Sequence, residues 1–134
     1  MRSIFAAFTM LLALCVPISA SASYMREAKL IAVYFYADWC GYCKIMSRRL
    51  SETKKLGRFD GDVLFVTMDF TNPARIDRST RLAESIGIDG YVRHQGSAVG
   101  YVALLDAASK SEIIRLDSGD STQAMLQTIR EELE

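Results

Sequence analysis

Two cysteines separated by two residues, Cys40 and Cys43, are the residues of this sequence best suited to chemistry. They lie where an apolar run, residues 30–37, gives way to a helical pattern that begins at Gly41. The free N–H groups and partial positive charge at a helix N-terminus favour the thiolate form of the first cysteine. A stabilised thiolate both attacks a disulfide and leaves one readily. The spacing therefore predicts a thiol–disulfide exchange site, with Cys40 as nucleophile and Cys43 as resolving cysteine.

The N-terminus has the pattern of a leader. A short basic start at Arg2 precedes an apolar stretch, residues 4–18, and Ala20-Ser21-Ala22 provides an A-x-A cleavage site. We expect residues 1–22 to be a signal peptide and residues 23–134 to form the mature domain. An uncleaved anchor is the alternative, but a membrane-spanning helix takes about 20 apolar residues. The protein is thus predicted to be exported, periplasmic or secreted, without stable membrane insertion after cleavage.

Cleavage of the leader would also remove Cys15, the third cysteine, and leave one pair in an oxidising compartment. A purely structural disulfide is the alternative, but closing so short a loop restricts the unfolded chain little. A metal site needs more ligands than one such pair, and the single histidine, His94, is far away in the sequence. Haem attachment needs a histidine where Lys44 stands. We expect a redox pair that needs neither a metal nor another cofactor.

Composition indicates one globular domain. Half of the 134 residues are apolar, and 16 basic side chains balance 16 acidic ones. No basic stripe or charged tail is present, so nucleic-acid binding is not expected. There is no internal repeat and no linker, and we expect a monomer of one domain with a modest core.

The pattern of apolar residues predicts the element order β-α-β-α-β-β-α. The expected strands are residues 30–36, 62–70, 99–105 and 112–116. The last two are joined by so short a segment that they must form an antiparallel hairpin. An α/β fold follows, with a mixed four-stranded sheet flanked by helices. In such sheets the chemistry lies at the C-terminal end of the first strand, where the cysteines are.

Three helices are expected, and each has an apolar stripe. The first runs from Gly41 to Gly57, the second is capped by Asn72 and ends at Gly87, and the third opens with Asp120 and Gln123 as a capping pair. The predicted inward-facing residues are Ile45, Met46, Leu50, Thr53 and Leu56, then Ile76, Leu82, Ala83 and Ile86, then Met125, Leu126, Ile129 and Leu133.

The segment from Tyr36 to Lys44, Tyr-Ala-Asp-Trp-Cys-Gly-Tyr-Cys-Lys, resembles the active-site segment of the thioredoxin superfamily. Its first five residues are similar to exported thioredoxin-like domains, including one that reduces other periplasmic thiol proteins, and its Gly-Tyr dipeptide is similar to that of periplasmic disulfide isomerases. The resemblance implies a thioredoxin-like fold and an exported thiol–disulfide oxidoreductase that acts on protein thiols and disulfides, with another redox protein as electron donor or acceptor. A reductase is the expected direction. A disulfide isomerase or oxidase, or a non-catalytic binding module, is the alternative.

The same resemblance implies which residues surround the cysteines. Trp39, Gly41 and Tyr42 are expected to form the rim on which a partner docks. The family places a cis-proline before its third strand, and here Gly100 or Val99 takes that position, so we expect a trans peptide and a substrate-binding role.

Two further expectations concern proton transfer and an insertion. The family has a buried aspartate six residues before the first cysteine, where this chain has Tyr34. We expect Tyr34 to be a packed core aromatic, and Asp38 is the candidate for proton transfer. Residues 89–98 are expected to be an inserted, mobile loop that borders the cysteines, with His94 as a remote candidate for a proton donor.

Overall fold

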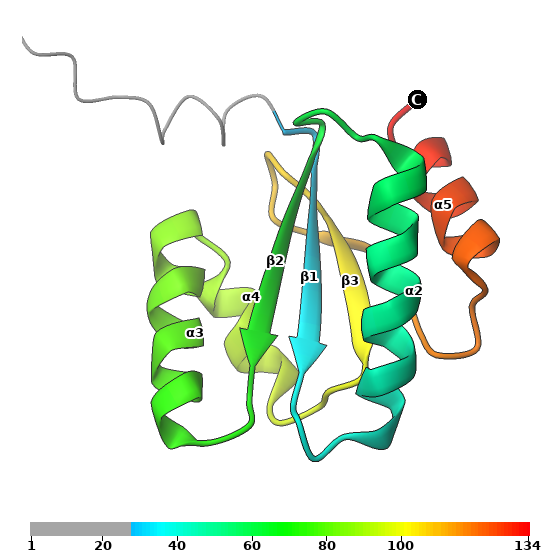
Figure 1. Ribbon diagram of the computed structural model, residues 1–134. Coiled ribbons are helices and arrows are strands. Elements are labelled where there is room, and N and C mark those ends of the chain that lie inside the picture. Colours follow the sequence, from blue (N-terminus) through cyan, green and yellow to red (C-terminus); the bar gives the residue numbers. More distant parts are fainter. Residues whose placement is uncertain (1–27) are drawn as a thin grey trace, which may run out of the picture.

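The computed structural model describes residues 28–134, so the predicted leader, its cleavage site and Cys15 lie outside the described residues. The chain forms, in order, β1 (Leu30–Tyr36), α2 (Gly41–Gly57), β2 (Val63–Asp69), α3 (Pro73–Ile86), α4 (Asp89–Gln95), β3 (Tyr101–Asp106), β4 (Glu112–Leu116) and α5 (Thr122–Glu131) (Figure 1). None of these helices is long and apolar enough to cross a membrane.

The four strands form one mixed sheet in the order β2-β1-β3-β4. Strand β1 runs parallel to β2 and antiparallel to β3, and β3 pairs with β4 as an antiparallel hairpin. The predicted fold class is therefore confirmed. Because β3 is antiparallel to β1, its first residues lie beside the last residues of β1, at the edge where the cysteines follow (Figure 1).

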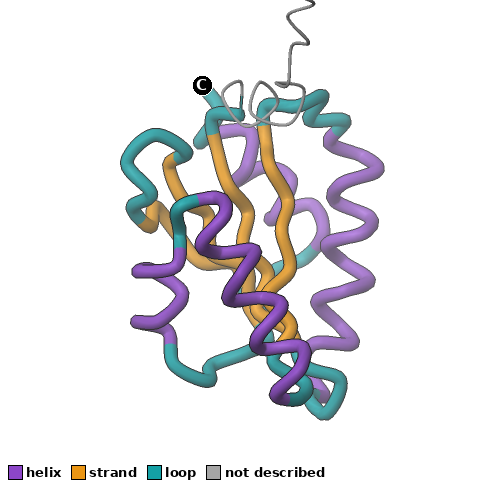
Figure 2. The backbone as a smooth tube through the Cα atoms, turned by 90° about the vertical axis from the view of Figure 1, so that its left-hand side faces the viewer, coloured by secondary structure: helices purple, strands orange, loops and turns teal. Residues whose placement is uncertain are grey.

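Helices cover both faces of the sheet. Helices α2 and α5 contact each other and enclose one core cluster, while α3 and α4 enclose a second cluster on the opposite face. Figure 2, viewed from the side of α3, shows this helix running across the strands. Strand β1 contributes alternate residues to the two clusters, which explains its continuous apolar sequence.

The expected loop at residues 89–98 is wrong, because most of it is helix α4. Val92 is buried against the second core cluster, and its N–H donates to the Ile88 carbonyl over 2.9 Å. An ion pair of 2.7 Å between Arg93 and Asp89 joins successive turns of the helix. The helix ends at Gly96, which has φ 61°. The predicted element order β-α-β-α-β-β-α therefore omits helix α4, which lies between α3 and β3.

The predicted helix stripes are partly wrong. Met46, Leu50, Thr53, Ala83 and Ile86 are buried, and so are Met125 and Ile129, but Ile45, Leu56, Ile76 and Leu82 are exposed. Each helix buries a narrower face than the apolar pattern suggested. In α3 a polar residue is buried as well, because Ser79 Oγ accepts a 2.8 Å hydrogen bond from the Asp69 N–H.

The starts of α5 and β3 also differ from the prediction. Ser121 caps α5 by accepting from the Ala124 N–H over 3.1 Å, whereas the Asp120 carboxylate accepts from the Asp117 N–H. Strand β3 begins at Tyr101, so Val99 and Gly100 lie in the preceding loop. This loop position matters for the site described next.

Candidate functional site

Cys40 and Cys43 lie at the junction between β1 and α2, as the sequence predicted. They form a disulfide, with Cα atoms 5.3 Å apart. Cys40 is the N-cap of α2, and its Sγ accepts a hydrogen bond of 3.2 Å from the Cys43 N–H. Cys40 retains 8% of its surface while Cys43 is 0% exposed. Cys40 is therefore the more accessible of the two cysteines.

Gly100 closes one side of the disulfide. A Cβ atom at this position would lie 3.4 Å from the Cys40 Sγ and 3.9 Å from the Cys43 Sγ. Its φ of 94° lies in the left-handed region, which side chains rarely adopt. Its N–H donates to the Phe35 carbonyl over 2.8 Å, which ties the loop to β1. The described residues contain no cis peptide, so the loop before β3 has the expected trans geometry.

The surface around Cys40 is apolar and open. Trp39 is 63% exposed and Tyr42 is 68% exposed, although both are large aromatic residues. No atom lies within 4 Å of a Cβ built at Gly41, so the space in front of the helix start is free. Val99 is half-buried and packs against the first core cluster. Exposed aromatic side chains beside a reactive sulfur are typical of a surface that contacts another protein.

The loop between β1 and α2 is tied to the loop after β2. The Asp38 N–H donates to the Thr71 hydroxyl over 3.0 Å, and the Thr71 N–H donates to the Asp69 carboxylate over 2.9 Å. Arg75 completes the link with a 2.7 Å ion pair to Asp69. Partial burial raises the pKa of the Asp69 carboxyl, but the hydrogen bonds from Thr71 and Arg75 outweigh this effect and hold the pKa below its ordinary value. Asp38, the candidate for proton transfer, is itself exposed.

Tyr34 is buried directly beneath the first turn of α2, on the core side expected for it. Its hydroxyl donates to the Cys43 carbonyl over 2.8 Å and is 3.0 Å from the Ser47 Oγ. Burial raises the pKa of Tyr34, and the hydrogen bond with Ser47 offsets this only in part. The hydroxyl is therefore a neutral donor at every physiological pH. Sequence reasoning missed this contact with a cysteine.

Helix α4 is held against the sheet by a polar cluster. Tyr91 donates to Glu112 on β4, and Arg115 donates to Glu112 over 2.7 Å and to Gln95 over 2.6 Å. Tyr101 also donates to Gln95, over 3.1 Å, and the Arg115 guanidinium lies 4.7 Å from the Tyr101 ring centroid. Because Tyr101 directly follows Gly100, this cluster anchors both ends of the loop that faces the disulfide.

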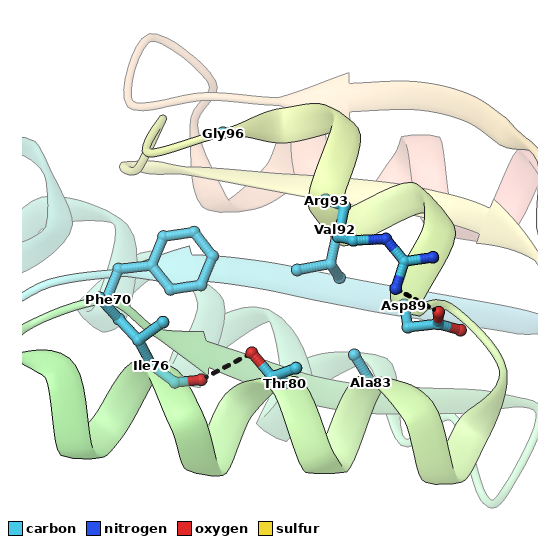
Figure 3. A pocket seen from close by; sticks show the side chains of 8 residues that line it. All are labelled: Phe70, Ile76, Thr80, Ala83, Asp89, Val92, Arg93 and Gly96. Carbon is cyan, nitrogen blue, oxygen red and sulfur yellow. Dashed lines mark hydrogen bonds and ion pairs between the residues drawn. The ribbon is translucent and has the colours of Figure 1, made fainter.

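A pocket of about 150 Å³ between α3 and α4 is separate from the cysteines (Figure 3). Its lining includes Phe70, Ile76 and Val92, and Arg93 and Asp89 form their ion pair at its edge. Neither cysteine contributes to it. His94 is exposed on α4 and borders a different, shallow hollow with Gly90 and Arg93. These features lie on the face of the sheet opposite α2, so they do not form part of the site around the disulfide.

The contacts of Ser47 and Tyr34 with the first turn of α2 were not predicted, although the sequence contains indications of both. Ser47 follows Cys43 by four residues, which places both on one face of a helix. Tyr34 precedes Cys40 on the strand that leads to the site. Nothing in the spacing joins Gln95 to Arg115, because that contact needs α4 to form and β4 to pair with β3.

Comparison with known families gives a match to the thioredoxin family over residues 19–91, more than half of the chain. Among curated proteins, a protein disulfide isomerase-like 2-1 from Oryza sativa subsp. japonica is 31% identical over 67 residues, which cover 50% of this chain and 17% of that protein. Thioredoxin-T from Drosophila melanogaster is 54% identical over 28 residues, covering 21% of this chain and 18% of that protein. The matched segments thus span about one sixth of each relative.

Solved structures with the same fold are more distant in sequence. A structure titled DsbH oxidoreductase has a TM-score of 0.58 and 16% identity, covering 94% of each chain. Trxlp from Edwardsiella tarda EIB202 has a TM-score of 0.52 and 19% identity, covering 84% of this chain and 94% of that one. At these identities the likeness concerns the fold alone.

Proposed function

The chain belongs to the thioredoxin family, and from this premise we propose that it is a thiol–disulfide oxidoreductase that exchanges disulfides with protein partners through Cys40 and Cys43. The observation that carries the proposal is the position of Cys40. Its sulfur is at the N-cap of α2, is disulfide-bonded to a buried Cys43 and is flanked by exposed Trp39 and Tyr42. A helix N-terminus stabilises a thiolate at that place.

The proposed reaction has two steps. With the pair reduced, the Cys40 thiolate attacks a partner disulfide, a bond forms between Cys40 and one partner sulfur, and the other leaves as a thiolate. The Cys43 thiolate, whose proton passes to solvent, then attacks the Cys40 sulfur. The Cys40–Cys43 disulfide forms and the second partner sulfur leaves. The partner gains two electrons and the protein loses two, so the pair itself carries the electrons and no cofactor is required.

The partner is proposed to dock on Trp39, Gly41 and Tyr42, with Val99 and Gly100 on the other side of the sulfur. Gly100 has no side chain between its backbone and Cys40, so an extended partner segment can approach the disulfide closely. The mobile loop expected at residues 89–98 does not form one side of this docking surface. Most of it is helix α4, which its polar cluster holds, and in the segment that follows α4 Gly100 lies beside the two sulfurs.

We propose reduction as the direction, because the Tyr-Ala-Asp-Trp-Cys string resembles exported thioredoxin-like domains that include one reducing other periplasmic thiol proteins. Isomerase or oxidase activity is the second candidate, favoured by the disulfide isomerase-like name of the matched rice protein. The reduction potential of the cysteine pair separates the two. A potential near that of thioredoxins, about −270 mV, supports a reductase, whereas a value of about −180 mV, typical of disulfide isomerases, supports the second candidate.

Export is proposed from the sequence of residues 1–22, with a periplasmic or secreted mature protein beginning at Ser23. An oxidising compartment suits a domain whose described part contains two cysteines, both in the redox pair. Another exported or membrane-bound redox protein would then be the electron donor or acceptor.

Reduction of insulin disulfides by dithiothreitol, with and without the protein, tests the function. We expect the protein to accelerate insulin precipitation and the Cys40→Ser variant to show no acceleration. A folded wild-type protein that leaves the rate unchanged would identify the domain as a binding module instead, in which the disulfide serves only as a latch for a partner.

A further inference from the structure

The hydroxyl of Tyr34 is a buried polar group that the two exchange steps do not use. It makes two contacts, both to the first turns of α2: the Cys43 carbonyl at 2.8 Å and the Ser47 Oγ at 3.0 Å. Tyr34 is 5% exposed and lies in the same core cluster as both cysteines. A buried hydroxyl needs a hydrogen-bond partner, and here that partner is the backbone of the buried cysteine of the pair.

These contacts fix the place of Cys43. The carbonyl of Cys43 belongs to the same residue as the sulfur that must attack Cys40. The hydrogen bond from Tyr34 joins this carbonyl to β1, a strand that is buried on both faces of the sheet. Cys40, by contrast, is a cap residue with φ −87° and ψ 113°, outside the helix. Cys43 is therefore tied to β1 by the Tyr34 hydroxyl, whereas Cys40 ends the loop before the helix, where its N–H donates to the Ala37 carbonyl over 3.2 Å.

We propose that Tyr34, with Ser47, is a positioning residue for Cys43 that acts in the resolving step of the exchange. This rests on the proposed function. When a partner occupies Cys40, the anchored first turn keeps the Cys43 sulfur within reach of the Cys40 sulfur beneath Gly100. The Cys43 sulfur is then already placed to attack the Cys40 sulfur, and such preorganisation lowers the barrier of an intramolecular step. The first step, attack by Cys40 on a disulfide, does not depend on Tyr34.

A single-turnover reaction with one equivalent of Ellman's reagent separates the two steps. Reduced Cys40 attacks the reagent disulfide and releases one coloured thiolate, and Cys43 then displaces the second from the mixed disulfide. In Tyr34→Phe the ring stays and the hydroxyl is lost. We expect the second release to slow about tenfold, the size expected when one buried hydrogen bond no longer holds the attacking group, while the first release keeps the wild-type rate.

Three matched variants complete the test. Tyr36→Phe removes a hydroxyl from the neighbouring ring, 5.8 Å away between centroids, and should leave both rates unchanged. Ser47→Ala should slow the second release, and Ser47→Thr, which keeps the hydroxyl, should restore it. The Ser47 pair also decides the matter if Tyr34→Phe does not fold, because Ser47 is exposed.

The proposal is overturned if Tyr34→Phe has the same second rate as Tyr36→Phe. It is also overturned if both releases slow by the same factor, since that would indicate a general loss of structure. In the case of an unfolded Tyr34→Phe, equal second rates for Ser47→Ala and Ser47→Thr would overturn it. Because the reagent is small, these rates are independent of insulin reduction, so failure of the proposed protein substrates and failure of Tyr34 as a positioning residue are seen separately.

Discussion

Replacing Gly100 by alanine tests how the loop before β3 is fitted against the disulfide. Alanine would meet both an unfavourable backbone conformation and the neighbouring side chains. The backbone has φ 94°, and holding a side chain in so sparsely populated a region costs about 1–2 kcal/mol. The added Cβ would lie 3.4 Å from the Cys40 Sγ and 3.5 Å from the Tyr42 Cβ, which is van der Waals contact without a severe clash. Backbone strain therefore destabilises the variant more than crowding does.

We expect Gly100→Ala to fold and to lose about 1–2 kcal/mol of stability. For a domain of this size that corresponds to a fall in Tm of about 4–16 °C, measured by thermal unfolding of the oxidised protein. The methyl group also fills the approach to Cys40. Reduction of insulin should therefore slow by more than reaction of the reduced Cys40 with iodoacetamide, because the small reagent needs less room than a protein segment.

Two glycines provide controls. Gly96 has φ 61° with no atom within 4 Å of a built Cβ, so Gly96→Ala isolates the backbone strain. Gly41 lies in α2 and has equally open space, so Gly41→Ala adds neither backbone strain nor crowding and is the control for thermal unfolding alone. The reasoning is refuted if Gly100→Ala has the same Tm as Gly41→Ala. It is also refuted if Gly100→Ala reduces insulin as fast as Gly96→Ala does.

Four further outcomes are expected. Iodoacetamide should label Cys40 of the reduced protein before Cys43, because Cys40 keeps some exposed surface and Cys43 keeps none. Cys43→Ala should trap partners as mixed disulfides on non-reducing gels, whereas Cys40→Ala should not. Equal labelling of the two cysteines, or equal adducts in the two variants, would contradict the assignment of nucleophile and resolving cysteine. The hydrogen bond from Arg115 lowers the pKa of the Glu112 carboxyl, so its contribution is present above the unfolded value of about 4.3 and is lost as pH falls through the lower folded value. Urea unfolding of Glu112→Gln across that acidic range should therefore show a weaker loss of stability than the wild type, and identical slopes would exclude the contribution. The intact mass of the protein from its native compartment should correspond to a start at Ser23, whereas a full-length mass would favour an uncleaved anchor.

The sequence alone determined the fold class and the reactive pair. The run in β1 is apolar at every position because helices cover both faces of the sheet, and the change of period after Ala37 marks the strand–helix junction that carries Cys40. Such patterns are local, since each depends on residues within one element. Asn72 before Pro73, and Gly87 after α3, were likewise readable as caps because capping is set by neighbouring backbone groups.

Tertiary structure decided which of the apolar helix residues are buried, and where α4 lies. Ile76 and Leu82 fit the helical pattern yet are exposed, because the width of the buried face depends on how α3 sits on β2 and α4. Helix α4 is short and contains Gly90, so its own residues predicted a loop. Its hydrogen bonds to Glu112 and Arg115 come from a strand that lies well beyond it in the chain, after β3.

The surroundings of the sulfurs were decided in the same way. Cys40 and Cys43 are adjacent through helix geometry, which spacing expresses, but Gly100 and Tyr34 reach them from the loop before β3 and from the core face of β1. The resemblance named Gly100 as a neighbour of the cysteines, and it gave no reason for the hydroxyl of Tyr34 to contact Cys43. Contacts between elements depend on sheet register and on the distance between sheet and helix, and a single sequence expresses neither of these directly.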